Sequence, residues 1–214
     1  MIIDPTRVVV FLHVLLFAYW LGSDLGVFVC GLGARAKTVT ADGRRALMEA
    51  GALIDMAPRT CLVLMVPVGL TLAAGYGSPI HGIPLALVWA ASLAWLWLVW
   101  QVHFKHDEPL GKLFWKIDFG IRALVMAAFV GFGGWCLVTG GPITGRWLAV
   151  KILLFGLIIL AGIIVRILLL APAATAAAPP APGARDGKSA IRQVVFVIWG
   201  LVAVIAFLGV AKPF

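Results

Sequence analysis

Charged side chains are scarce in this chain of 214 residues. Asp, Glu, Lys and Arg make up 12% of it, whereas 63% is hydrophobic and the mean hydropathy is +1.07. Soluble domains carry about a quarter charged residues. This composition therefore excludes a soluble globular protein. It predicts an all-α, polytopic integral membrane protein with the lipid bilayer as its main surrounding.

Cysteines and nucleotide-binding motifs are equally sparse. Cys30, Cys61 and Cys136 form no Cys-x-x-Cys pair and lie in or near apolar runs, which argues against a disulfide framework or a zinc ribbon. Neither a Gly-x-Gly-x-x-Gly turn after a strand nor a Walker loop occurs. These absences fit a non-catalytic membrane subunit of a larger electron-transfer complex, one of three functions considered below.

Long apolar runs are abundant. They predict a six-transmembrane-helix bundle in a single membrane domain, 1–214, with spans at about 8–29, 60–75, 85–102, 119–138, 147–171 and 190–210. The Ala- and Pro-rich stretch at about 172–189 is expected to be a loose cytoplasmic linker.

Basic residues give the orientation. Those that follow the first, third and fifth spans outnumber those on the other side, where the sequence has Arg7, Arg146, Lys151 and Lys212. The positive-inside rule then places both termini on the outer side of the cell inner (plasma) membrane. The net charge of +8 is spread over loops, so we expect anionic lipid and no nucleic acid as its partner.

An internal repeat relates the middle spans. A shift of 118 − 55 = 63 residues pairs Asp55 with Asp118 and Arg59 with Arg122, and it also aligns two Gly-x-Pro-Ile-x-Gly elements. Spans two and three thus duplicate spans four and five as a parallel duplicated helical hairpin. Each Asp-x3-Arg pair has the spacing of an ion pair along one helix. We expect interfacial anchors, or alternatively Arg59 or Arg122 turning inward to meet Asp24 or a propionate.

Three ionisable residues, His13, Asp24 and Lys151, lie inside predicted spans, where they are costly unless partnered. His13, Phe17, Trp20 and Asp24 fall on one stripe of the first helix. A neutral imidazole is a common ligand for a metal or for heme iron, so His13 is a candidate ligand. Asp24 is expected to pair with an arginine or to end a proton path.

Other candidates are less specific. Lys151 lies at a depth similar to that of His13 and could share its ligand or extend to the interface. His81 is a candidate second axial ligand or a solvated loop histidine. The segment from His103 to Glu108 could bind a metal but fits a polar surface better. Trp89 and Trp95 could line a pocket for a flat ring or serve packing alone.

A family resemblance rests on three segments. His13-x6-Trp20-x-Gly22 resembles the first helix of HemJ-type protoporphyrinogen oxidases and the related CopD-like membrane proteins. The run from Gly145 to Lys151 resembles the HemJ-type motif Gly-Trp-Leu-x-x-Lys, and the terminal Lys-Pro-Phe is similar to the HemJ-type terminus. The resemblance implies that His13 and Lys151 are associated with heme b.

The last helix lacks the family's Arg-x2-Asn-Glu-x-Pro motif, because Arg192 is followed by Gln193 and Val194. The sequence thus predicts a heme b-binding membrane protein with a redox or electron-transfer role. A HemJ-like oxidoreductase is one form that this role could take. A CopD-like copper-handling protein, with His13, Met65 and His81 as ligands, and the membrane-subunit interpretation are the alternatives. Other membrane or redox subunits, or a second copy of the chain, are the candidate protein partners.

Overall fold

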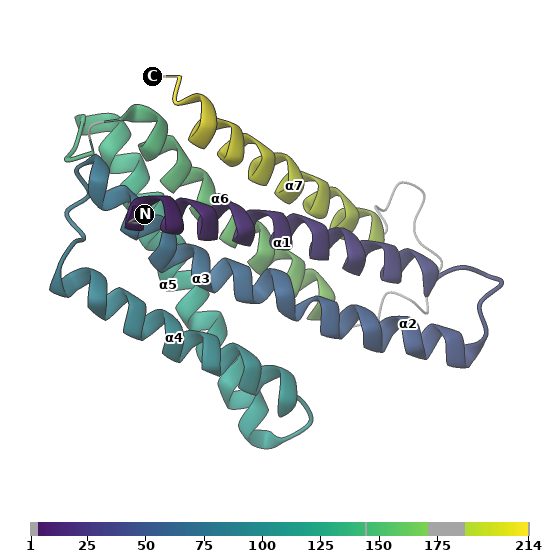
Figure 1. The fold of residues 1–214 in the computed structure, drawn as a ribbon. Coiled ribbons are helices and arrows are strands. Elements are labelled where there is room, and N and C mark those ends of the chain that lie inside the picture. The colour runs from purple at the N-terminus through teal and green to yellow at the C-terminus, as the bar shows by residue number, and fades with distance from the viewer. Residues whose placement is uncertain (1–3, 144, 171–186, 214) are drawn as a thin grey trace. The chain divides into compact units, whose positions relative to one another are not determined.

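The structure, a computed structural model, describes residues 4–143, 145–170 and 187–213, and every regular element in these ranges is helical (Figure 1). Six helical segments are long and apolar enough to cross a membrane, which confirms the predicted all-α, multi-pass class. The elements are α1 (Pro5–Gly33), α2 (Ala41–Ile54), α3 (Met56–Ala73), the 3-10 turn η1 (Ala74–Tyr76), α4 (Ile83–Phe104), α5 (Pro109–Thr139), α6 (Arg146–Leu170) and α7 (Gly187–Ala211).

Several helices extend past the predicted spans. The second span follows directly on α2, an amphipathic helix, with only Asp55 between α2 and α3. Likewise α5 begins at Pro109, ten residues before the predicted start of that span. Hydropathy marks only the stretch that fits the hydrocarbon layer, whereas backbone hydrogen bonding continues the helix into the polar surroundings. The predicted linker at 172–189 lies mostly outside the described residues.

The repeat is visible in the helix boundaries. Both α4 and α6 begin at positions related by 146 − 83 = 63 residues. Gly77 and Gly140, which the same shift pairs, both have left-handed backbone conformations, with φ of 80° and 72°. Glycine adopts this conformation without steric cost, so each copy can turn in the same way after its first helix.

The chain forms two compact units, residues 1–118 and 119–214, and α5 contributes to both. In the first unit, α1 lies alongside α2 and α3, and α3 also packs against α4 (Figure 1). A Cβ built on Gly33 would lie 3.2 Å from Leu47, and one on Gly26 would lie 3.3 Å from Ile54. The two pairs have the same sum of residue numbers, as expected for antiparallel helices in register.

In the second unit, α6 packs against α7 and against the later part of α5. A Cβ on Gly133 would lie 2.6 Å from the backbone nitrogen of Leu153, and one on Gly156 would lie 2.7 Å from the side chain of Val130. These glycines therefore let the α5 and α6 backbones approach closely, as small residues do in membrane helix pairs.

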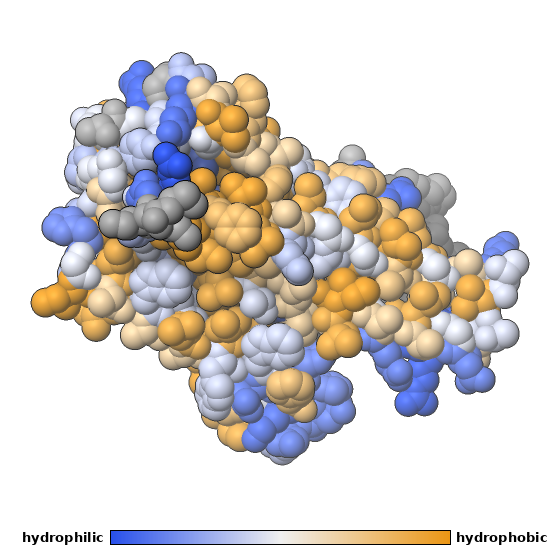
Figure 2. Space-filling model, in the orientation of Figure 1, coloured by the Kyte–Doolittle hydropathy of each residue, from blue (hydrophilic) through white to orange (hydrophobic). Residues whose placement is uncertain are grey.

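Large apolar side chains are exposed along most helices, and hydrophobic residues cover much of the visible surface in Figure 2. Examples are Phe11, Leu124 and Val210, which are 62%, 71% and 87% exposed. Such exposure is unfavourable in water but ordinary against lipid. The surface thus agrees with a membrane-spanning chain.

Candidate functional site

The predicted stripe of His13, Phe17, Trp20 and Asp24 lies on the less exposed side of α1. Trp20 is 5% exposed, and His13, Phe17 and Asp24 are half-buried. On other faces of the same helix, Phe11 and Tyr19 are each 62% exposed. The stripe that carries His13 and Asp24 thus faces protein, since α1 packs against α2 and α3.

His13 lies against α3 at a glycine. A Cβ built on Gly69 would be 3.7 Å from Cε1 of the His13 ring. In antiparallel helices, the residue numbers of successive contacting pairs have a nearly constant sum. His13 and Gly69 have nearly the same sum as Gly26 with Ile54, so this contact continues the antiparallel packing of α1 along α2 and α3. A larger residue at 69 would project towards the imidazole. The α1–α3 packing therefore places a half-buried histidine over a position with no side chain.

A hydrogen bond between two side chains joins α3 to α4. Trp89 donates a hydrogen bond from Nε1 to the Thr71 hydroxyl at 3.1 Å, and that hydroxyl donates to the Pro67 carbonyl at 2.7 Å. Pro67 lies inside α3 and lacks an amide hydrogen, so the helix has one backbone bond fewer there. The Trp89 indole thus serves helix packing; whether it also borders a ring pocket stays a prediction.

The first repeated pair forms an ion pair along its helix. Arg59 donates from a guanidinium nitrogen to the Asp55 carboxylate, and their side chains are 33% and 30% exposed. The i,i+4 spacing predicted this ion pair along one helix; its position at the membrane interface stays a prediction. Partly exposed pairs of this kind contribute about 0–1 kcal/mol to stability.

The second repeated pair is much more buried. Asp118 is 0% exposed and accepts a hydrogen bond of 2.8 Å from Nε1 of Trp95, and Arg122 is 6% exposed. The sequence analysis predicted the same role for both pairs and did not anticipate that the second pair is more buried. A signal was present: Trp95 lies nine residues before the end of α4 and Asp118 nine residues after the start of α5, so an antiparallel hairpin brings them level.

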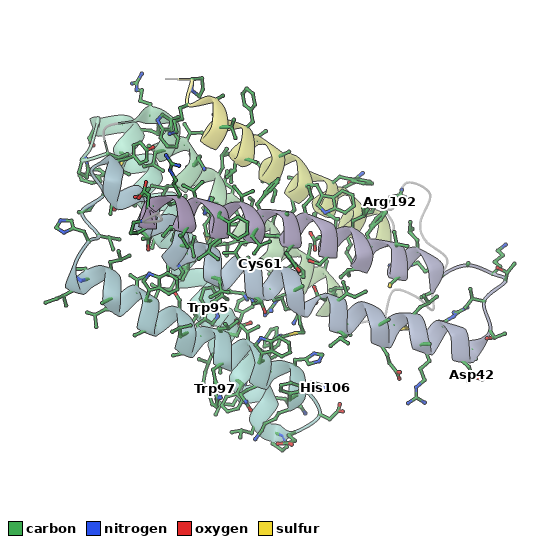
Figure 3. The ribbon with its side chains drawn as sticks, in the orientation of Figure 1. Asp42, Cys61, Trp95, Trp97, His106 and Arg192 are labelled. Atoms are coloured by element: carbon green, nitrogen blue, oxygen red, sulfur yellow. The ribbon has the colours of Figure 1, made fainter. Side chains whose placement is uncertain are left out.

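Figure 3 labels Trp95, Trp97 and His106 along this hairpin. Trp97 is 59% exposed and packs edge-on against Phe114 with 6.0 Å between ring centroids. Trp95, by contrast, is 5% exposed. The two tryptophans therefore have different roles: one bonds a buried carboxylate and the other lies on the surface of the hairpin.

Lys151 belongs to the second unit. Its Nζ lies 6.0 Å from the ring centroid of Trp147, and the Nζ of Lys212 lies 5.6 Å from the same ring. The structure thus brings together the two segments, Trp147 to Lys151 and the end of α7, that carried part of the family resemblance. His13 lies in the first unit, so joint binding of one ligand by His13 and Lys151 stays a prediction.

The remaining histidines are near the surface. His81 is exposed in the connection before α4. His106 lies 3.0 Å from the Asp107 carboxylate and 3.0 Å from the His103 carbonyl oxygen, and the His106 and Asp107 side chains are 70% and 90% exposed. Within the described parts of the chain, no group of three or more His, Cys, Asp or Glu side chains is arranged to hold a metal ion.

Comparison of the chain with protein-family models, with curated proteins and with solved structures finds no match. The resemblance to the HemJ-type and CopD-like families therefore rests on the quoted sequence segments alone.

Proposed function

We propose that this protein is a heme b-binding membrane protein with a redox or electron-transfer role, and that His13 is an axial ligand of the heme iron. The observation that carries the proposal is the position of His13, half-buried on the protein-facing stripe of α1 and seated over Gly69 of α3. An imidazole inside a membrane has a free-energy cost unless it is partnered, so such a residue is a candidate for a functional site.

The residues present fit such a group. Imidazole is the usual protein ligand of b-type heme, and His13 is a half-buried residue whose ring nitrogen Nδ1 is buried. Gly69 leaves the space beside Cε1 without a side chain, and Trp20 adds a buried aromatic on the same stripe. Heme would supply a one-electron redox centre, while the helices would orient the histidine and exclude water.

Further residues complete the proposal. Lys151 is the proposed partner of His13, and His81 the alternative one. Arg59 and Arg122 are the proposed partners of heme propionates or of Asp24, with the Arg59–Asp55 ion pair competing for the first of them. These assignments come from the sequence analysis.

The first test is a spectrum of the detergent-purified protein, oxidised and reduced, with and without His13→Ala. We expect a Soret band in the parent protein and its loss or shift in the variant, with membrane insertion unchanged. His103→Ala is the matched control because it removes an imidazole at the end of α4. An unaltered Soret band in His13→Ala would refute the axial role.

Lys151→Met tests the second ligand. A thioether cannot replace an amine without changing the spectrum, so a ligating Lys151 predicts altered absorption at unchanged heme content. An identical spectrum would leave the second ligand to His81 or another residue, which His81→Ala then tests.

The same spectra separate the alternatives. A protein that binds copper with His13, Met65 and His81 would lack the Soret band and contain stoichiometric copper. A non-catalytic membrane subunit would contain neither and would co-purify with other redox subunits. We further propose that the multi-pass chain lies in the cell inner membrane with both termini on the outer side, because basic residues are concentrated after the odd-numbered spans.

A further inference from the structure

The α1–α2 hairpin is longer than a bilayer requires. The 29 residues of α1 span about 43 Å and the helical segment Ala41–Tyr76 spans about 54 Å, whereas the hydrocarbon layer is about 30 Å thick. In α2, Asp42, Arg44, Arg45 and Glu49 are all exposed, as suits a helix in water. These lengths and charges indicate that α2, with the end of α1 that lies beside it, extends past the hydrocarbon layer (Figure 1).

The end of α1 beside α2 has no charged residue of its own. Residues 25–33 consist of Leu, Gly, Val, Phe and Cys. One stripe on each helix faces the other helix: Gly26 against Ile54, Cys30 against Gly51, and Gly33 against Leu47. The residues one position earlier lie about 100° away around each helix, and in two antiparallel helices they turn to the same side.

These earlier residues form one apolar surface across both helices, which we call the hairpin face. Its members are Leu25, Val29 and Leu32 of α1 and Ala46, Ala50 and Leu53 of α2. All six are exposed, the leucines and the valine by 47–62%. Figure 2 shows hydrophobic side chains over the α1–α2 hairpin and hydrophilic ones along its edge. An apolar surface of this kind outside the hydrocarbon layer marks an interaction site.

We propose that the hairpin face binds the hairpin face of a second copy of the chain, so that two hairpins form a four-helix bundle at the inner side of the membrane. Two copies in one bilayer have the same orientation, so the two-fold axis that relates them runs along the membrane normal. This axis places α1 of each copy against α2 of the other copy. The arrangement does not depend on the proposed heme.

The two helices are complementary in side-chain size. The register of the hairpin places Val29 and Leu32 near the level of Ala50, and Leu25 near the level of Leu53. The larger side chains of α1 in one copy would therefore pack over the small side chains of α2 in the other, as in helix bundles.

Charge and area also favour a second copy as the occupant. The ion pair of Arg45 with Glu49 lies two positions from Leu47, on the side of α2 that faces away from α1, so it stays in water when two hairpin faces meet. Over two copies, the exposed area of the six side chains is on the order of 1,000 Å², the size at which specific interfaces between proteins begin.

The first test is the oligomeric state of the detergent-purified full chain, measured by size-exclusion chromatography with light scattering. We expect a dimer for the parent protein and association at least about tenfold weaker for Val29→Arg, because each copy would bury a charge against the other. Met48→Arg is the matched control and should remain dimeric. Met48 is 64% exposed on α2, but it follows Leu47 and therefore lies on the opposite side of the hairpin.

Disulfide cross-linking tests the arrangement of the two copies. Two differently tagged chains are produced together, one with Val29→Cys and the other with Ala50→Cys, and both have the three native cysteines replaced by alanine. We expect a disulfide that joins the two tags, because each Val29 would lie against Ala50 of the other copy. Replacing Ala50→Cys by Met48→Cys should abolish this product.

A parent protein that is monomeric both in detergent and in lipid nanodiscs would overturn the proposal, since lipid or the second unit of the same chain would then cover the hairpin face. A dimer that Val29→Arg leaves intact would also overturn it. So would a different protein that co-purifies with the parent chain and is lost in Val29→Arg. If the chain without native cysteines does not fold, the two arginine variants decide the question.

Discussion

At the scale of single residues, Asp118 shows how one helical hairpin accommodates a carboxylate away from water. It is 0% exposed, and the Trp95 indole donates to it at 2.8 Å. Its repeat equivalent, Asp55, is part-exposed and paired with Arg59. Two copies of one motif thus have different surroundings, because burial depends on what packs over each helix.

Trp95→Phe should lower the free energy of unfolding by about 1–3 kcal/mol, since a buried acceptor loses a donor and the smaller ring leaves a cavity. Thermal unfolding in detergent would measure it. Trp97→Phe, at a position 59% exposed on the same helix, should have little effect. Equal losses in the two variants would contradict the stabilising role of the buried Trp95 indole.

Asp24 is half-buried on the stripe of α1 that also carries His13. Our hypothesis is that Asp24 pairs with an arginine, so Asp24→Asn should lower thermal stability and leave the spectrum of the proposed heme and the pH dependence of its redox potential unchanged. Slower proton-coupled turnover in a protein of normal stability would instead support a proton path. No change in any of these measurements would refute both roles.

At the scale of helices, glycines determine how closely neighbours approach. Gly133 of α5 and Gly156 of α6 contact the opposite helix at distances that leave no room for a Cβ. Gly134, the next residue, meets nothing within 4 Å. Sequence alone does not separate these neighbours, because only the rotation of α5 about its axis decides which glycine faces α6.

Gly133→Ala should therefore destabilise the second unit by about 1–3 kcal/mol through overpacking against the α6 backbone. Gly134→Ala is the control and should be neutral or stabilising by up to about 1 kcal/mol, because alanine favours the helix. Thermal unfolding of the two variants, compared in one detergent, is the measurement. A harmless Gly133→Ala would contradict the close α5–α6 approach.

At the scale of the whole molecule, the basic residues predict one orientation in the membrane. A reporter fused near Gly183 should lie in the cytoplasm, because basic segments are retained inside. A reporter fused at Phe214 should lie on the opposite side, because the predicted sixth span lies between the two positions. Phosphatase and fluorescent-protein fusions would measure this. Signals from the same side for both positions would contradict the six-span topology.

The sequence by itself determined the class of the protein and much of its chain organisation. Hydropathy predicted six spans, the shift of 63 residues anticipated the matching starts of α4 and α6, and periodicity placed His13, Trp20 and Asp24 on one stripe. These features depend on composition and on the fixed geometry of the α-helix, so local sequence suffices to specify them.

Only the tertiary structure decided which residues meet. The seating of His13 over Gly69, the bond from Trp95 to Asp118, and the approach of Lys151 and Lys212 to Trp147 each join residues far apart in the chain. Such contacts depend on the rotation and register of packed helices. These are set by side-chain packing over whole interfaces, and no single motif in the sequence encodes them.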